Sequence, residues 1–207
     1  PREVEQDVEM INKLSIETIV YTPGVESIYG DSVETLDYDF GTIVQYMEGK
    51  YRQGHFGGVA TVIKHLFDIV KPHKAFFGEK DYQQLRLIQQ LVKKTGQPVD
   101  VIGCATSRKT SGLARSSRNK RLNNDQLQQA KIIPQALTLA KSHFKQKPID
   151  EIKKDVNNLF ADSSVELEYF EIAPTSNLVP VEKPVEGEKH RAFIAAFVNG
   201  VRLIDNS

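Results

Sequence analysis

The segment Gly78-Glu79-Lys80-Asp81 has the residue types of a phosphate-binding turn. An apolar run precedes it and an amphipathic stretch follows it, so the turn is expected between a strand and a helix. The first N–H groups of such a helix carry partial positive charge and bind phosphate, and Lys80 adds a full charge. Gln84, three residues after Asp81, offers an amide to an organic ligand. The alternative, which spacing alone favours, is an ordinary helix start capped by Asp81.

A second segment, residues 112–119, places two hydroxyl groups between two guanidinium groups. Its centre reads Arg115-Ser116-Ser117-Arg118, and further Lys and Arg residues flank it. Hydroxyl and guanidinium donors together bind phosphate oxygens well. The alternative is a flexible basic loop without a ligand, and that alternative is favoured if the segment is considered alone.

Arg52 and His55 lie three residues apart in a glycine-bounded loop, residues 48–56. Arginine holds a carboxylate or phosphate through two parallel hydrogen bonds. Histidine either donates to a phosphate or transfers a proton. A single histidine in a loop more often does neither, so this pair also needs support from elsewhere in the chain.

The bulk composition excludes several kinds of partner and site. Lys+Arg and Asp+Glu both number 27, so the net charge of zero gives no argument for binding nucleic acid or an anionic membrane surface. The sequence has no zinc-ligand spacing, no Walker A motif and no G-x-G-x-x-G motif, so no metal-ligating residues are assigned. No apolar stretch has the length of a membrane span. The single cysteine, Cys104, lies in the apolar run 99–104 and is predicted to be a buried structural thiol, which fits a reducing cytoplasm.

The elements that must position these residues alternate between helix and strand over residues 59–104. Helical periodicity covers 59–71 and 81–94, and short apolar runs at 74–77 and 99–104 are typical of buried strands. This alternation predicts a parallel, doubly wound sheet, whose ligands bind at the carboxyl ends of the strands.

The pattern changes after residue 106. Residues 105–121 are polar and basic, and we expect them to form a hinge between domains, a common place for ligands. The rest of the chain predicts a small α+β domain with helices at 123–146 and 148–160, strands at 165–172, 192–198 and 201–204, and an Asn199-Gly200 hairpin turn. The expected domains are therefore residues 1–106 and 107–207. Before them, the sequence predicts a helix at 3–14, a strand at 16–21 and a strand or hairpin arm at 33–40.

Taken together, the three segments resemble the pantoate–β-alanine ligase family, the pantothenate synthetases. The matching stretches are E-G-K-Y-R-Q-G-H-F-G-G-V-A-T-V (48–62), F-F-G-E-K-D-Y-Q-Q-L (76–85), S-G-L-A-R-S-S-R-N (111–119), Y-F-E-I (169–172) and V-R-L-I-D-N (201–206). The resemblance covers essentially the whole chain. It implies a partial Rossmann-like α/β nucleotidyltransferase domain with a parallel sheet, followed by a small α+β C-terminal lid domain.

The resemblance also implies an activity. Such enzymes use ATP with Mg²⁺ to condense pantoate and β-alanine through pantoyl adenylate, releasing pyrophosphate and then AMP. By resemblance, Lys80, His55 and Arg118 are the expected catalytic residues, and Gln84, Arg52 and His55 the pantoate-binding ones. The expected ATP-binding residues are Gly78, Glu79, Lys80, Asp81, Ser107, Arg115, Ser116, Ser117 and Arg118. The family further implies a homodimer in the cytoplasm, with no nucleic-acid or membrane partner.

The sequence departs from the family at its start. The family's M-G-x-L-H-x-G-H and F-V-N-P-x-Q-F segments, which supply a catalytic histidine and a glutamine for pantoate, have no counterpart in these residues. We therefore expect these 207 residues alone to be inactive. The alternatives are a non-catalytic folded module, an RNA-binding piece using residues 108–121, and an adenylate-forming enzyme that acts on another acid.

Overall fold

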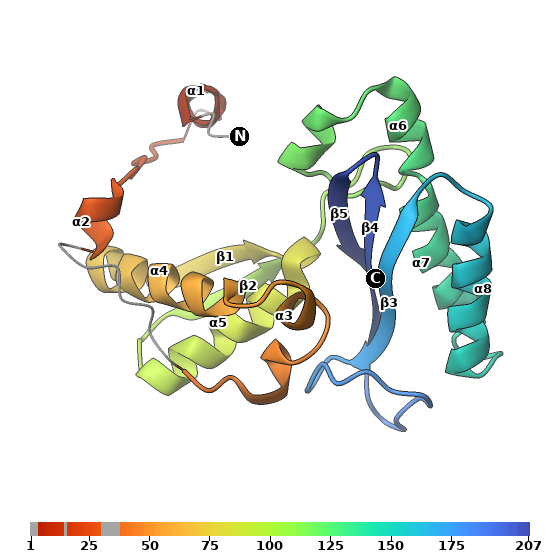
Figure 1. Cartoon of the computed structure of the whole chain (residues 1–207). Helices are drawn as coiled ribbons and strands as arrows, with labels where there is room; N and C mark the ends of the chain where they lie inside the picture. Colours follow the sequence, from red (N-terminus) through yellow and green to blue (C-terminus); the bar gives the residue numbers. More distant parts are fainter. Residues whose placement is uncertain (1–3, 15, 30–37) are drawn as a thin grey trace. The chain divides into compact units, whose positions relative to one another are not determined.

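The computed structural model describes residues 4–14, 16–29 and 38–207 (Figure 1). The chain forms two compact units, residues 1–34 and 35–207, and each is described by itself.

The first unit contains two short helices, α1 (Val4–Asn12) and α2 (Val25–Tyr29), and neither has a buried residue. The predicted strand at 16–21 is wrong, because this stretch has no regular structure and Ile19 is 93% exposed. β-rich composition does not form a strand without a partner strand or a core to cover it. The predicted strand at 33–40 lies largely outside the described residues, and its last three residues are not a strand.

The α/β part of the second unit follows the predicted alternation. Helix α4 (His55–Val70) leads to β1 (Lys74–Gly78), α5 (Tyr82–Thr95) and β2 (Asp100–Cys104). The two strands are parallel, with Lys74 opposite Asp100 and Gly78 opposite Cys104. Phe77 and Ala75 on one face of β1 pack with the two helices into a shared apolar core, whereas Phe76 on the other face is 65% exposed. Cys104 ends β2 and is exposed, so the prediction of a buried thiol is wrong.

Four short elements connect the larger ones. They are the 3-10 helices η1 (Gly41–Val44), η2 (Glu79–Asp81) and η3 (Ser117–Arg121), and the one-turn helix α3 (Glu48–Tyr51). Gly49 in α3 has no room for a side chain, because a Cβ there would lie 2.2 Å from the carbonyl oxygen of Val44. The glycine therefore allows α3 to pack directly on the preceding turn.

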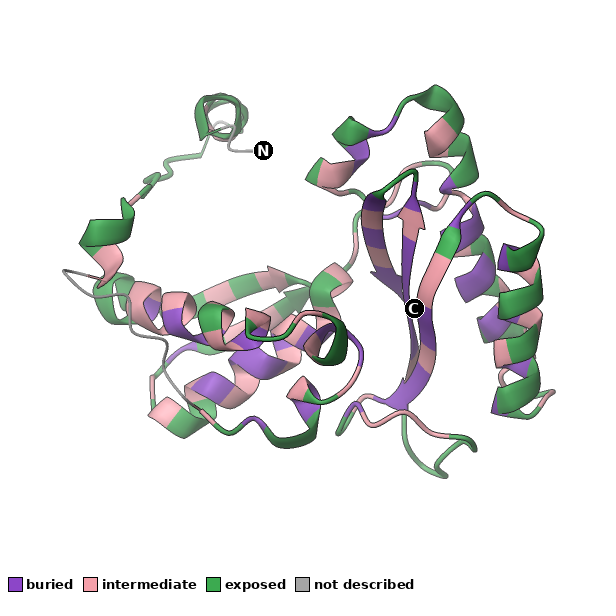
Figure 2. Ribbon diagram, in the orientation of Figure 1, coloured by how far each residue is buried: buried purple, intermediate pink, exposed green. Residues whose placement is uncertain are grey.

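The C-terminal part is an antiparallel sheet in the order β3 (Glu166–Pro174), β4 (His190–Val198), β5 (Val201–Asn206). Helices α7 (Ile132–His143) and α8 (Ile149–Ala161) pack against one face and form a core with it. The other face contributes Tyr169, Phe193 and Ala195 to the core of the α/β part. Figure 2 shows the buried residues along β4 and along the side of α7 that faces the sheet.

The predicted single helix at 123–146 is wrong, because it is two helices, α6 (Asn124–Gln129) and α7. Pro134 lies in the first turn of α7, where its ring lacks an N–H and would clash with the carbonyl of Ala130 in a continuous helix. The predicted mixed fold is confirmed: one sheet is parallel and a separate sheet is antiparallel. The predicted boundary at residue 106 stays a prediction.

Candidate active site

The predicted phosphate turn lies at the carboxyl end of β1, where parallel strands place their ligand sites. Strand β1 ends at Gly78, η2 carries Lys80, and α5 begins at Tyr82. The Lys80 ammonium is 3.9 Å from the carboxylate of Asp81, and its side chain is 19% exposed. Asp81 makes no side-chain capping hydrogen bond, so the structure does not bear out the alternative of a simple Asp81 cap.

Asn206, at the end of β5, holds this turn from another part of the chain. Its amide nitrogen donates to the carbonyl oxygens of Glu79 (2.9 Å) and Lys80 (2.7 Å). Arg191 completes the arrangement: it donates to the amide oxygen of Asn206 and to the carboxylate of Glu79 (3.1 Å), and its guanidinium lies 4.1 Å from the centre of the Tyr82 ring. The carboxylate of Glu79 is thus engaged by Arg191, which is 112 residues away in the sequence.

One pocket collects residues from two of the three predicted segments. Arg52 and His55 come from the region of α3 and α4, and Lys80, Asp81 and Gln84 come from η2 and α5. Its volume is about 20 Å³, enough for roughly one water molecule. The residues that line this pocket therefore do not by themselves enclose a space of the size of a nucleotide.

Gln83 and Gln84 have different environments although they are adjacent. Gln83 is buried; its amide nitrogen donates to the carbonyl oxygens of Ile43 (2.5 Å) and Tyr46 (2.9 Å), and its oxygen accepts from the N–H of Glu48 (3.0 Å). Gln83 therefore joins α5 to the start of α3. Both residues line the pocket, but Gln84 is only partly buried, so its amide can meet a ligand.

A buried charge cluster forms one wall of the pocket. The Glu48 carboxylate accepts two hydrogen bonds from Arg202 (2.7 and 3.0 Å), one from the Tyr169 hydroxyl (3.0 Å) and one from Arg52 (3.3 Å). Arg202 also pairs with Glu168 at 2.5 Å. Burial opposes ionisation of Glu48, but the hydrogen bonds and charge of Arg202 outweigh it and hold the pKa of Glu48 below its ordinary value. Burial and the neighbouring Glu48 charge raise the pKa of Tyr169 well above normal, so its hydroxyl remains a donor.

His55 is held next to Arg52, with 2.9 Å between Nε2 and the guanidinium. Arginine can only donate, so Nε2 accepts and the ring proton is on Nδ1. Burial, then the positive charge of Arg52, lowers the pKa of His55, and Arg118 adds to the effect. The imidazole is therefore neutral at neutral pH, and Arg118 lies within electrostatic range of it.

The predicted hinge segment is attached to β5. The Ser116 hydroxyl accepts from the N–H of Arg118 (3.2 Å) and caps η3, and the Arg118 guanidinium donates to the carbonyl oxygen of Arg202 (2.9 Å). The N–H of Arg115 donates to the carbonyl oxygen of Ser107 (2.8 Å). None of the predicted residues Ser107, Arg115, Ser116, Ser117 and Arg118 lines the pocket with Lys80, and neither do Gly78 and Glu79.

Several residues of the site were missed by the sequence reasoning. They are Glu48, Tyr169, Arg191, Arg202 and Asn206. The available signal was the polar pair Asp205-Asn206 at the end of an apolar strand, within a stretch already noted for its resemblance to the ligase family. Asp205 is buried and accepts two hydrogen bonds from Arg108 (2.6 and 2.9 Å), which attaches the hinge segment to the same strand end.

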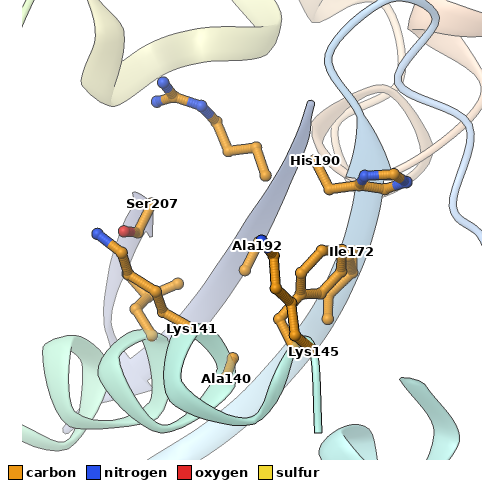
Figure 3. A pocket seen from close by; sticks show the side chains of 10 residues that line it. Ala140, Lys141, Lys145, Ile172, His190, Ala192 and Ser207 are labelled. Carbon is orange, nitrogen blue, oxygen red and sulfur yellow. The ribbon is translucent and has the colours of Figure 1, made fainter. Parts of the chain in front are cut away.

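A second pocket is larger but has a different chemical character. It has a volume of about 430 Å³ and lies between α7 and the strands β3 and β4. Figure 3 shows Lys141 and Lys145 on its helix side and Ile172, His190 and Ala192 on its strand side. None of the predicted site residues lines it. The convergence of charged and amide groups on the smaller pocket identifies that pocket as the candidate active site.

The part of the chain that the structure describes contains no group of three or more His, Cys, Asp or Glu side chains that could hold a metal ion. Among the described helices, none is long and apolar enough to cross a bilayer.

The parallel β–α–β unit, with cationic and amide side chains gathered at its carboxyl edge, defines the chain as an α/β enzyme. Comparisons with known proteins agree. The family model described as pantoate-beta-alanine ligase matches residues 1–207. The chain belongs to this family and is a ligase.

Several known pantothenate synthetases are similar to this chain in sequence or in structure. The pantothenate synthetases of Christiangramia forsetii and Flavobacterium psychrophilum are each 44% identical over 207 residues, which is 100% of this chain and 73% of each relative. The crystal structure of pantothenate synthetase from Thermus thermophilus has a TM-score of 0.91 at 34% identity, covering 100% of this chain and 75% of that one. The Francisella tularensis pantoate-beta-alanine ligase, complexed with beta-gamma ATP and beta-alanine, has a TM-score of 0.76 at 31% identity, covering 100% and 70%.

Proposed function

We propose that this chain binds ATP and pantoate in the pocket between α3–α4 and η2–α5 and takes part in joining pantoate to β-alanine through pantoyl adenylate. The observation that carries the proposal is the meeting of Arg52, His55, Lys80 and Gln84 in that one pocket. The Francisella tularensis relative, complexed with beta-gamma ATP and beta-alanine, supports the choice of ligands.

The reaction has two substitutions. A pantoate carboxylate oxygen attacks the α-phosphorus of ATP; the bond from that phosphorus to the bridging β-phosphate oxygen breaks and pyrophosphate leaves. The β-alanine amine then attacks the acyl carbon, the bond from that carbon to the phosphate oxygen breaks, AMP leaves and the nitrogen loses a proton. Both steps need positioning and charge stabilisation more than a covalent protein group.

The residues of the pocket match these needs. Lys80, which follows the end of β1, stabilises charge that develops on the phosphates. Arg118 does not line the pocket, but its charge acts on His55, and we assign it to the same task. Gln84 and Arg52 bind pantoate, and neutral His55 orients the Arg52 guanidinium through its Nε2 acceptor. Gly78, Glu79, Asp81, Ser107, Arg115, Ser116 and Ser117 complete the proposed ATP site through backbone and hydroxyl groups. Mg²⁺ supplies further charge neutralisation and would arrive bound to the phosphates, since the described residues form no cage for it.

Replacement of Lys80 tests the proposal. In an active form of the enzyme, Lys80→Ala should lower kcat for pantothenate formation by about 10²–10³-fold, the usual effect of removing one electrostatic stabiliser. Lys93→Ala, at an exposed position of α5, is the matched control and should leave kcat unchanged. An unchanged kcat in Lys80→Ala would show that the assigned role is wrong.

Pantoate labelled with ¹⁸O in its carboxylate tests the intermediate. The label must appear in AMP if pantoyl adenylate forms.

The homodimer and the cytoplasmic location are further parts of the proposal, and both rest on the family resemblance. A different acid substrate is the main competing function, and pantoate should be preferred over other hydroxy acids in the same assay.

A further inference from the structure

We propose that Asn206 is a positioning residue for catalysis, because its side-chain amide fixes the turn that sets the location of Lys80. This inference rests on the role proposed above for Lys80. It adds a residue from β5, 126 positions away from Lys80 in the sequence, to the machinery of the site.

The contact is made through both hydrogens of one amide. Asn206 Nδ2 donates to the carbonyl oxygens of Glu79 and Lys80, two consecutive residues of η2, at 2.9 and 2.7 Å. Two hydrogen bonds to adjacent peptide groups fix both the distance of the turn from β5 and its orientation. The direction of the Lys80 side chain depends on that backbone.

Asn206 is itself held rigidly. It is 3% exposed, its N–H donates to Asp205 (2.8 Å) and its carbonyl oxygen accepts from Arg108 (3.0 Å). Its amide oxygen accepts from Arg191 at 2.5 Å. These neighbours also settle the orientation of the amide, because a flipped side chain would place oxygen against two carbonyl oxygens and NH₂ against a guanidinium.

The turn has little support of its own. Gly78, which precedes η2, has no side chain, and Asp81, which precedes α5, makes no side-chain cap. The Glu79 side chain is tied to Arg191, which is in turn bonded to Asn206. The placement of Lys80 therefore depends on the end of β5 as well as on its neighbour Asp81, whose carboxylate lies 3.9 Å from the Lys80 ammonium.

A purely structural role for Asn206 makes a different prediction. In that case its loss would reduce the stability of the protein but leave the chemistry of folded molecules intact. A positioning role predicts a lower kcat for the folded enzyme, because an ammonium displaced by about 1 Å stabilises the reacting phosphates poorly.

The test uses Asn206→Asp and Asn206→Ala in an active form of the enzyme. Asn206→Asp keeps the size and the bond to Arg191 but cannot donate to the two carbonyl oxygens, and Asn206→Ala removes the donors without adding charge. In both, kcat per folded molecule should fall about tenfold to a hundredfold. Val156→Ala, a fully buried position of α8, is the control for lost stability and should leave kcat unchanged.

A double-mutant cycle with Lys80→Ala separates action through Lys80 from independent action. If Asn206 works by placing Lys80, Asn206→Asp should have almost no further effect once Lys80 is alanine. Multiplied effects of the two changes, or a full kcat in both Asn206 variants, would overturn the inference. An unchanged kcat in Lys80→Ala alone would instead overturn the proposed function of Lys80, so the two failures are distinguishable.

Discussion

At the scale of single residues, the Glu48 cluster shows how buried charges are made tolerable. Glu48 and Arg202 are both largely withdrawn from water, with side chains 9% and 13% exposed. An isolated charge in such a place costs several kcal/mol. Here Glu48 accepts from Arg202, Tyr169 and Arg52, and Arg202 is shared with Glu168, so each charge has partners of opposite sign or good donors.

This cluster predicts a loss of stability in acid. The pKa of Glu48 is lowered from an ordinary value of 4.5, so its contribution is complete above pH 4.5 and is lost as the pH falls through the folded-state pKa. Glu48→Gln should lower the free energy of unfolding by about 2 kcal/mol at pH 7, since it removes charged hydrogen bonds. The difference between variant and parent should shrink below pH 4.5 in urea titrations at a series of pH values.

Asp150→Asn is the matched control for this prediction. Asp150 pairs with Lys154 at 3.7 Å, but both side chains are more than half exposed. An exposed pair contributes little, so the change should be within about 0.5 kcal/mol. A pH-independent difference for Glu48→Gln would contradict the assigned ionisation.

The sequence predicted only part of the site at this scale. Arg52, His55, Lys80 and Gln84 were candidates by residue type and spacing and were assigned to the site through the family resemblance, and they do share a pocket. Arg202 and Asn206 were not selected, because their partners are 154 and 127 residues away and no local pattern marks such contacts. The roles assigned to Ser107 and to Arg115–Ser117 remain predictions.

At the scale of elements, periodicity worked where a segment had a core to cover. The helix, strand, helix and strand between residues 55 and 104 appear as expected, because their apolar faces pack together. The strand expected at 16–21 failed for want of a partner strand, and the helix expected at 123–146 is broken near Pro134. A β-rich stretch therefore forms a strand only where it has a partner to pack against, and a helical pattern is interrupted where proline lacks the N–H that a continuous helix needs.

The hairpin between β4 and β5 yields a prediction about glycine. Asn199 and Gly200 both have positive φ, 47° and 77°, which is the geometry of a two-residue hairpin turn. A Cβ at Gly200 would have no atom within 4 Å, so any penalty comes from the backbone alone. Gly200→Ala should lower the free energy of unfolding by about 1–2 kcal/mol, measured by urea denaturation.

Gly58 provides a control of opposite sign. It also has open space around its missing Cβ, but it lies in helix α4 without a positive φ. Gly58→Ala should raise the free energy of unfolding by about 0.5–1 kcal/mol. Equal effects at the two glycines would contradict an explanation based on backbone geometry.

At the scale of the whole second unit, one antiparallel sheet belongs to two cores. Along β4, Phe193 and Ala195 face the core of the α/β part, whereas Ile194 and Ala196 face the helices α7 and α8. Alternate side chains of a strand point to opposite faces, so both cores depend on the same strands. Unfolding of the sheet would expose both cores at once.

Residues 38–207 should therefore unfold in one cooperative transition. Leu91→Ala in one core and Leu137→Ala in the other remove comparable buried side chains. Each should lower the free energy of unfolding by about 2–5 kcal/mol and shift the same single transition in scanning calorimetry. Two separate transitions, each shifted by only one of the variants, would show that the cores unfold independently.

The neighbours of Tyr169 have an optical consequence. The chain contains seven tyrosines and no tryptophan, so tyrosine dominates its intrinsic ultraviolet fluorescence. The Tyr169 phenol donates to the carboxylate of Glu48, and its ring lies 5.2 Å from that of Tyr51. A carboxylate that accepts the proton of an excited phenol quenches its light. We therefore expect Tyr169 to emit weakly while Glu48 accepts its hydrogen bond, so tyrosine emission should rise when that contact is lost.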